Sequence, residues 1–132
     1  MSIFTWQDAY SVDEGMIDTQ HKKLLKIAET LFNAVLAQKE EKYIESCFDD
    51  LLSYTQKHFN DEETYFKKIG SEKLSPHAEE HKVLATELQN VWQMELLGFN
   101  DEKGRELLTW VEDRLIPHMM IDDSEAFHSA KD

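Results

Sequence analysis

Apolar residues recur at intervals of three and four positions along four long segments of the chain. This spacing places side chains on one face of an α-helix. The four stripes that it defines, in chain order, are His21, Leu24, Ala28, Leu31 and Val35; Ile44, Phe48, Leu51, Thr55, His58, Glu62, Phe66 and Ile69; His77, His81, Leu84, Leu88 and Val91; and Leu107, Val111, Leu115 and His118. The pattern predicts four amphipathic helices that share one core.

Residues that start and stop helices set the expected boundaries. Asp18 is expected to cap the first helix, Gly70 to stop the second, and Pro76 to occupy the first turn of the third. The expected spans are Asp18 to about Gln38–Glu41, Lys42 to Ile69, Ser75 to Gly98, and Asn100 or Asp101 to Asp123. Four helices with short connections predict an all-α, up-down-up-down four-helix bundle.

The first 17 residues show little periodicity. We expect them to form an N-terminal arm that packs Ile3, Phe4 and Trp6 against the outside of the bundle. The whole chain, residues 1–132, is expected to form a single domain.

Six residues whose side chains can bind a metal ion lie on the inward stripes: His21, His58, Glu62, His77, His81 and His118. Two pairs, His58 with Glu62 and His77 with His81, are four residues apart, so the members of each pair point the same way from adjacent turns. A lone histidine on an apolar face is usually a hydrogen-bonded core residue. Five in phase on four helices instead indicate a metal site, because burying so many polar groups is costly unless each is paired or bound.

The number of candidate ligands favours two metal ions. Five histidines exceed what one tetrahedral zinc ion takes, and carboxylates can bridge two ions. The second carboxylate remains open from spacing alone. Asp122 is in phase with His118, whereas Asp123 lies about 140° around an ideal helix and needs a bend or a π-type turn, for which Pro117 gives a reason.

Composition narrows the possible partners. The formal net charge is −13, which argues against nucleic acid and anionic membranes as partners. The chain contains one cysteine, Cys47, which excludes an intrachain disulfide and a thiolate metal cluster and is expected to be a small core residue. With no targeting segment or membrane span evident, we expect a cytoplasmic protein.

Taken together, these motifs resemble the hemerythrin family, specifically its bacterial members. The matching residues are Trp6, Ser11-Val12, Ile17-Asp18-Thr19-Gln20-His21-Lys22, His58-Phe59-Asn60-Asp61-Glu62-Glu63, His77-Ala78-Glu79-Glu80-His81, and His118 with Asp123. The order and spacing of the whole set carry the resemblance, which covers nearly the entire chain.

The resemblance implies reversible dioxygen binding at a non-haem di-iron centre, for oxygen storage, transport or buffering. It implies that His77, His81 and His118 hold one iron, that His21 and His58 hold the other, and that Glu62 and Asp123 bridge them together with an oxo or hydroxo group. Dioxygen would bind at an open position on the two-histidine iron. The implied pocket residues are Leu24, Phe59, Leu115 and, beside His118, Met119.

Some positions depart from the family pattern. Asp13 and Glu14 follow the Ser-Val step where the family usually has glycine, and Arg114 stands where a tryptophan is common, four residues before the last histidine. These differences affect the surroundings of the site rather than its ligands.

Two other functions remain alternatives to oxygen binding. One is a di-iron peroxidase or oxidase, which is disfavoured because oxygen-activating ferritin-like enzymes use two Glu-x-x-His pairs. The single such pair here, Glu125 with His128, lies in the polar tail, so we expect a protein that is not an enzyme. The other is an oxygen or redox sensor that acts through a protein partner.

Overall fold

The computed structural model describes residues 4–92 and 101–129. The long helices are α1 (Met16–Leu36), α2 (Glu41–Ile69), α3 (Leu74–Trp92) and α4 (Asp101–Trp110), preceded by a 3₁₀ turn, η1 (Asp8–Tyr10). From α4 the chain continues as one helical rod through two π-helical segments, η3 (Val111–Leu115) and η4 (His118–Asp122), into α5 (Asp123–His128). No strand occurs in these two ranges.

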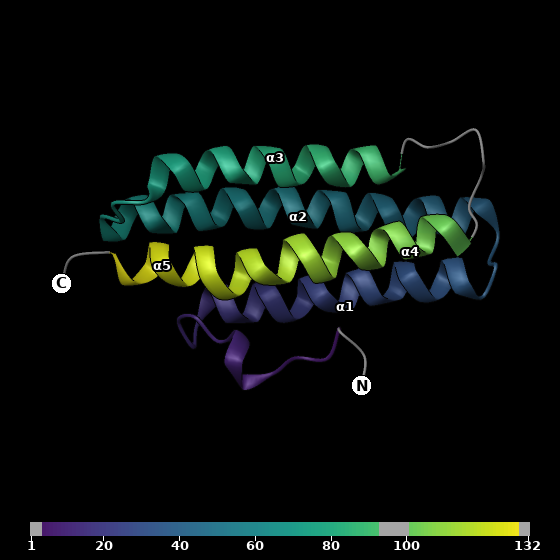
Figure 1. The fold of residues 1–132 in the computed structure, drawn as a ribbon, viewed down its shortest axis with the longest axis horizontal. Coiled ribbons are helices and arrows are strands. Elements are labelled where there is room, and N and C mark those ends of the chain that lie inside the picture. The colour runs from purple at the N-terminus through teal and green to yellow at the C-terminus, as the bar shows by residue number, and fades with distance from the viewer. Residues whose placement is uncertain (1–3, 93–100, 130–132) are drawn as a thin grey trace.

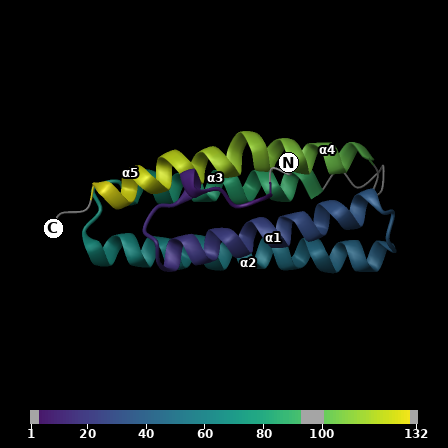
Figure 2. The same cartoon turned by 90° about the horizontal axis from the view of Figure 1, so that it is seen from below.

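The helices form the predicted four-helix bundle. Helix α1 packs on α2, α2 on α3, α3 on α4, and α4 closes the ring on α1. The α1–α2 pair forms one layer and α3 with the α4–α5 rod forms the other, as Figures 1 and 2 show. None of the helices, where the structure describes them, combines the length and the apolar character needed to cross a lipid bilayer.

Most residues of the inward stripes are buried, but the core that they form is interrupted. One apolar cluster fills most of the bundle, and a smaller one, built from Val12, Ile17, Phe66 and Ala126, lies at one end. Polar residues separate the two clusters: His21 follows Ile17 on α1, and Glu62 precedes Phe66 on α2. The bundle therefore contains a buried polar layer between two hydrophobic regions.

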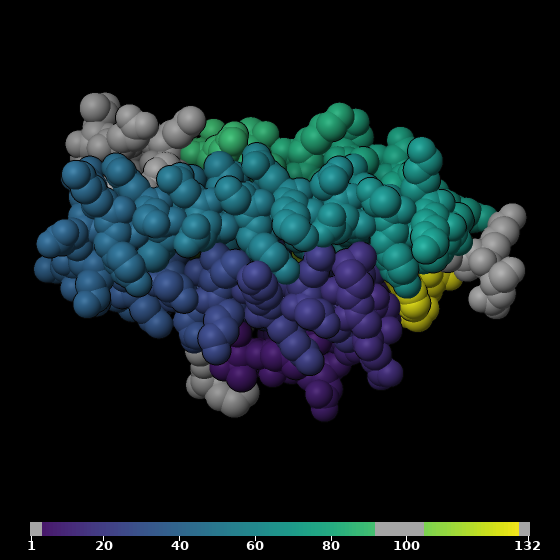
Figure 3. Space-filling view, turned by 180° about the vertical axis from the view of Figure 1, so that it is seen from behind, coloured from purple at the N-terminus to yellow at the C-terminus, as the bar shows by residue number. Residues whose placement is uncertain are grey.

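The N-terminal arm packs along the bundle, as expected for Phe4 and Trp6. Phe4 is buried with its ring centroid 5.6 Å from that of Phe32, and the Trp6 ring meets Tyr10 edge-on, with Lys22 above it. In the space-filling view from behind, α1 and α2 lie side by side across the face, with the arm along the edge of α1 (Figure 3). Ile3 lies outside the described residues.

The prediction that Asp18 caps the first helix is wrong. The helix begins at Met16, and it is Asp13 whose carboxylate accepts hydrogen bonds from the backbone N–H groups of Ile17 and Asp18, each at 3.1 Å. The Asp18 carboxylate points back to the arm and accepts the Ser11 hydroxyl and the backbone N–H groups of Val12 and Glu14. Both aspartates are good acceptors near a helix start, so sequence alone cannot tell which end of the turn each one serves.

The start and end of the second helix and the start of the third lie within one residue of their predicted places, whereas the fourth helix, expected to end at Asp123, continues as α5 to His128. Helix α2 ends at Ile69, and Gly70 takes the left-handed conformation (φ 76°) that lets the backbone N–H of Ser71 reach the Phe66 carbonyl. Helix α3 begins at Leu74, one residue early, so Pro76 is still in the first turn, where no backbone donor is needed. Gly98, the expected end of this helix, lies outside the described residues.

Candidate metal centre

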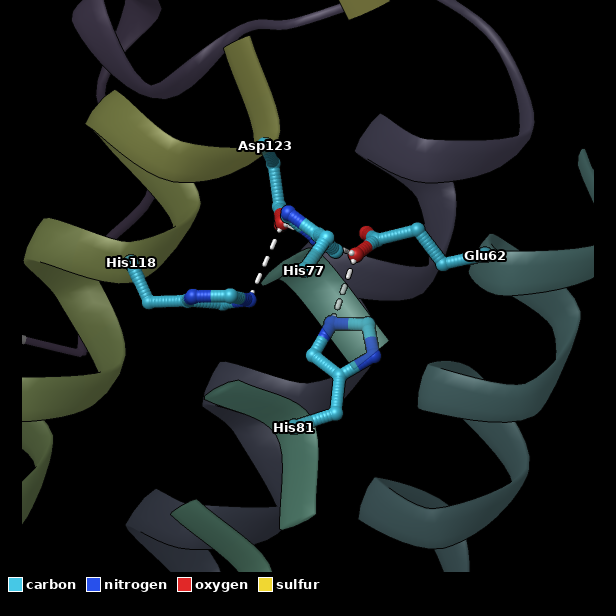
Figure 4. Close-up of side chains that lie close together, drawn as sticks. All are labelled: Glu62, His77, His81, His118 and Asp123. Atoms are coloured by element: carbon cyan, nitrogen blue, oxygen red, sulfur yellow. Dashed lines mark hydrogen bonds and ion pairs between the residues drawn. The ribbon is translucent and has the colours of Figure 1, made fainter. Parts of the chain in front are cut away.

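Seven polar side chains, contributed by all four helical segments of the bundle, converge in the buried polar layer. They are His21 from α1, His58 and Glu62 from α2, His77 and His81 from α3, and His118 and Asp123 from the C-terminal rod. Each is at most 4% exposed. Figure 4 shows Glu62 and Asp123 pointing toward each other, with the rings of His77, His81 and His118 directed at their carboxylates.

The ligand atoms form two groups that share both carboxylates. One group combines His77, His81 and His118 with Glu62 and Asp123, and the other combines His21 and His58 with the same two acids. Within each group all the candidate ligand atoms lie within 4.8 Å of one another. The three-plus-two division of histidines implied by the family resemblance is therefore present in the geometry.

Glu62 extends one oxygen toward each group. Its Oε1 lies 2.8 Å from His77 Nε2 and 3.0 Å from His81 Nε2. Its Oε2 lies 3.1 Å from His58 Nε2 and 3.4 Å from His21 Nε2. A carboxylate that meets two separate histidine groups through different oxygens is placed to bridge two ions.

Asp123 has the same arrangement from the opposite side. Its Oδ1 lies 2.6 Å from His77 Nε2 and 3.0 Å from His118 Nε2, and its Oδ2 lies 2.8 Å from His21 Nε2. The two carboxylates thus span the same pair of positions.

The π-helical segment η4 explains why Asp123, and not Asp122, points inward. The backbone N–H of Asp123 bonds to the carbonyl of His118, five residues back, so this turn contains one residue more than an α-helical turn. The fifth residue then lies above His118, where the fourth would lie in a regular helix. Asp122 is displaced to the rim, where its side chain is 46% exposed.

Three of the histidines make a hydrogen bond through Nδ1, on the side of the ring that faces away from the cluster. Nδ1 of His81 meets Glu63 Oε2 at 2.7 Å, and Nδ1 of His118 meets Asp122 Oδ2 at 3.0 Å. Nδ1 of His58 meets Gln20 Oε1 at 2.6 Å. Each partner atom is an oxygen that accepts, so each Nδ1 carries the hydrogen and each Nε2 presents its lone pair to the cluster.

The predicted pocket residues are all buried. Phe59 stacks on the His81 ring, with centroids 4.0 Å apart and planes at 4°. Leu24, Leu115 and Met119 are at most 1% exposed and belong to the same apolar cluster as Phe59. Arg114, by contrast, leaves the core, and its guanidinium pairs with Glu80 and Glu87 of α3 at 2.9 and 2.8 Å.

Cys47 is buried, as expected for a small core residue. His128, in the tail, is exposed and lies apart from the cluster.

A surface hollow of about 190 Å³ lies over the three-histidine side. It is lined by Lys73, Pro76, His77, Glu80, Asp122 and Glu125. His77 is therefore the cluster histidine that borders solvent-accessible space in this hollow.

The charges of the cluster depend strongly on one another. Burial lowers the pKa of His21 and His77, but the adjacent carboxylates of Asp123 and Glu62 outweigh it and raise the two values to about 9 and about 10. Burial raises the pKa of Asp123 and so does the Glu62 charge, yet the histidines bring it down to about 2. The pKa of Glu62 is also well below its usual range, because four histidines outweigh its burial.

The contacts within the cluster fit metal ligation better than a hydrogen-bond network. His21 Nε2, His118 Nε2 and both Asp123 oxygens are buried without a correctly aligned hydrogen bond to any of the described residues, although their separations are as short as 2.6 Å. Imidazole nitrogens and carboxylate oxygens that converge on a common point without aligned hydrogen bonds are the arrangement that a metal ion fits. Imidazole and carboxylate together suit iron, zinc, copper and nickel.

The choice among these metals comes from comparison with known proteins. The family model for the Hemerythrin HHE cation binding domain matches residues 13–129. The chain belongs to the hemerythrin family. Membership implies non-haem iron binding, and the His/Glu/Asp cluster is the place where the fold presents ligands for it.

Bacterial hemerythrins match almost end to end. A bacteriohemerythrin of Clostridium acetobutylicum is 29% identical over 127 residues, covering 93% of this chain and 98% of that protein. Bacteriohemerythrins of Campylobacter jejuni and Methylococcus capsulatus are 25% and 27% identical, over 87% and 90% of this chain and 86% and 90% of their own lengths. The chain is thus a bacterial hemerythrin-like protein.

The metal-free protein is expected to lose stability as the pH rises from 6.5 to 10. His21 and His77 have folded pKa values of about 9 and about 10, above the ordinary 6.5, so their contribution is complete below pH 6.5 and disappears as they deprotonate. Glu62 and Asp123 have lowered pKa values, so their contribution is lost on the acid side, below their ordinary values of 4.5 and 3.8. Thermal unfolding of chelator-treated protein should therefore show a maximum between pH 4.5 and 6.5.

Metal-loaded protein should behave in the opposite way over the alkaline range, because metal binding requires deprotonated imidazoles. A melting temperature of the metal-free protein that stays constant or rises from pH 6.5 to 9 would contradict the described charge network.

Proposed function

We propose that this hemerythrin binds dioxygen reversibly at a centre of two iron ions, for oxygen storage, transport or buffering. The observation that carries the proposal is the pair of buried carboxylates, Glu62 and Asp123, each of which faces both histidine groups through separate oxygens. These two carboxylates and the five histidines would hold two iron ions, which when bound would supply the two electrons that reversible dioxygen binding needs and take them back on release.

Unequal numbers of histidines give the two positions different tasks. His77, His81 and His118, with the two carboxylates, offer five ligands to one position, whereas His21 and His58, with the same two carboxylates, offer four to the other. The second position keeps room for a small ligand, so we place dioxygen there. His77, His81 and His118 would hold the first ion fixed.

The apolar residues next to the cluster would protect the bound oxygen. Leu24 is one turn after His21, and Leu115 and Met119 lie on either side of His118 along the rod. All three are buried, as is Phe59. Walls of this kind keep water and protons from the site, which favours release of the oxygen molecule over loss of a reduced oxygen species.

We propose a binding protein and not an enzyme. Glu125 and His128, which form the Glu-x-x-His pair of the tail, are both exposed and lie outside both ligand groups. Peroxide turnover by the iron-loaded protein would favour an oxidase or peroxidase instead. A partner protein captured in air but not under nitrogen would favour a sensor.

Iron analysis and optical spectra test the proposal together. Protein produced with adequate iron should contain close to two irons per chain. Its reduced form, prepared without oxygen, should change spectrum on exposure to air and return when oxygen is removed. One tightly held zinc ion per chain, or no metal, would contradict the two-iron centre.

Cutting Leu115 to alanine should shorten the lifetime of the oxygenated form. The side chain is 0% exposed, so its truncation leaves a cavity that costs roughly 2–5 kcal/mol of unfolding free energy and admits solvent to the site. The variant should still bind two irons. Stopped-flow spectra of the reduced variant mixed with air measure the lifetime.

Leu31→Ala is the matched control. Leu31 is 1% exposed in the same apolar cluster, but it lies ten residues along α1 from His21, a rise of about 15 Å. It should lose comparable stability and keep the wild-type lifetime. Equal lifetimes of the oxygenated form in Leu115→Ala and wild type would show that Leu115 does not line the pocket.

A further inference from the structure

Three polar side chains connect His58 to the surface of the bundle. Nδ1 of His58 lies 2.6 Å from Gln20 Oε1, and Gln20 Nε2 donates to Asp61 Oδ2 at 2.9 Å. Lys57 Nζ donates to the same aspartate oxygen at 2.8 Å. The chain crosses from α1 to α2, and its exposure increases outward, from 1% for the His58 side chain to 34% for Asp61 and 63% for Lys57.

The donor and acceptor in each of these hydrogen bonds can be assigned by starting from Lys57 at the surface. Lysine can only donate and an ionised carboxylate can only accept, so the Gln20 amide must turn its NH₂ toward Asp61. Its carbonyl oxygen then faces His58, and Nδ1 of that ring must be the donor. A surface ion pair thereby fixes the tautomer of a buried histidine, leaving Nε2 free for a metal ion.

The sequence positions of these residues explain how the helices deliver them. Gln20, Lys57 and Asp61 each come immediately before a cluster residue, His21, His58 and Glu62 respectively. One step along a helix turns the side chain by about 100°, so each of them lies on the flank of its helix when its neighbour points inward. The flanks of α1 and α2 face each other, because these two helices pack together.

The outer partners of the two histidine groups differ in charge. Behind the three-histidine group, Glu63 and Asp122 place carboxylates against Nδ1 of His81 and His118. Behind the two-histidine group, Gln20 places a neutral amide against His58, and Nδ1 of His21 is buried with no partner among residues 4–92 and 101–129. A carboxylate that accepts from a ligand imidazole makes the ring more basic and favours a higher metal charge, and an amide does so less.

We infer that Gln20 is a positioning residue that fixes His58 as a ligand and, because it is neutral, holds the two-histidine metal position in its lower oxidation state relative to the three-histidine position. The inference rests on the proposed two-iron centre. Reversible oxygen binding needs an iron at the two-histidine position that gives up an electron only when dioxygen binds and takes it back when dioxygen leaves. We assign to Gln20 the role of keeping this iron in its lower oxidation state until dioxygen binds.

Exchanging the amide of Gln20 and the carboxylate of Asp61 tests this inference. The double variant Q20E/D61N keeps the net charge and leaves an amide that can donate to the new carboxylate, so the hydrogen bonds to His58 are preserved while the neutral partner becomes anionic. In a redox titration of iron-loaded protein, a soluble mediator accepts one electron for each ferrous ion that becomes ferric. We expect the oxidation equilibrium of the variant to shift at least tenfold toward the ferric state, which is 59 mV for a one-electron step.

Glu63→Gln is the opposite control. It removes a carboxylate from behind His81, in the three-histidine group, and should shift the equilibrium toward the ferrous state. A wild-type midpoint potential in Q20E/D61N with two irons bound would overturn the inference. Failure of the wild-type protein itself to take up two irons would instead overturn the proposed function.

Gln20→Met provides a test that does not depend on the double variant. It keeps the size of the side chain and removes the hydrogen bond, so His58 loses its fixed tautomer. With wild-type helix content, we expect at least about tenfold weaker binding of the second metal ion, measured with zinc by calorimetry. Unchanged affinity would overturn the positioning role.

Discussion

Replacing Asp123 by alanine is expected to abolish binding of two metal ions. The side chain is 0% exposed, and its oxygens lie within 3.0 Å of His21, His77 and His118, so its loss removes a ligand shared by both positions. In the metal-free protein it also leaves protonated His21 and His77 without one of their two counter-charges. Breaking a buried pair of this kind costs about 3–5 kcal/mol. Metal analysis and chemical unfolding measure the two effects.

Asp122→Ala is the matched control because it removes the neighbouring carboxylate. Asp122 contacts His118 only from behind, at 3.0 Å from Nδ1, and is half exposed. The variant should bind two ions with about tenfold lower affinity and unfold almost as the wild type does. Two ions in Asp123→Ala and fewer in Asp122→Ala would show that regular helical phase, and not the π-helical turn, places the ligand.

Iron binding is expected to raise the melting temperature by on the order of 10–15 °C. Ions that bind only the folded chain add about 4 kcal/mol when their concentration is a thousand times the dissociation constant. In a domain of this size, each kcal/mol shifts the melting temperature by several degrees. Calorimetry of iron-loaded and chelator-treated samples at pH 7 measures the difference.

Two histidine variants distinguish stabilisation by iron bound at the cluster from effects of iron elsewhere on the protein. His81→Ala removes a buried ligand candidate, 3.0 Å from Glu62, and should lose most of the stabilisation by iron. His128→Ala removes an exposed histidine of the tail and should keep all of it. Equal melting temperatures of the wild type with and without iron would contradict a buried metal centre.

Helical periodicity predicts the bundle and six of the seven cluster residues without any structural information. His21, His58, Glu62, His77 and His81 lie in phase with the apolar residues around them, and α-helical geometry alone brings them together. The phase of His118 is also clear, because it continues the stripe of Leu107, Val111 and Leu115. Because the same spacing of three and four residues recurs on four helices, this part of the site can be predicted from the sequence.

Asp123 could be placed only through the family resemblance. Regular helical phase favours Asp122, and the difference comes from one wide turn at η4 that a periodic pattern does not encode. The beginning of α1 is a similar case, because Asp13 and Asp18 are both strong acceptors and only the path of the arm decides which backbone groups each one meets.

The residues behind the histidines could not be predicted. Gln20, Glu63 and Asp122 are polar residues on helix flanks, where most side chains simply face water. Their contacts with His58, His81 and His118 depend on how neighbouring helices are rotated and, for Asp122, on the wide turn. Two signals in the sequence point to them: adjacency to a cluster residue, as for Gln20 beside His21, and the four-residue spacing of His118 and Asp122.

The most direct test of the central claim is the amount of oxygen that the reduced, iron-loaded protein binds and returns. Solutions with two irons per chain would be cycled between oxygen and argon, with bound oxygen and free peroxide measured in each cycle. The proposed centre predicts one oxygen molecule per two irons, recovered as oxygen over repeated cycles. Oxygen that is consumed once, with peroxide released and the iron left oxidised, would contradict it.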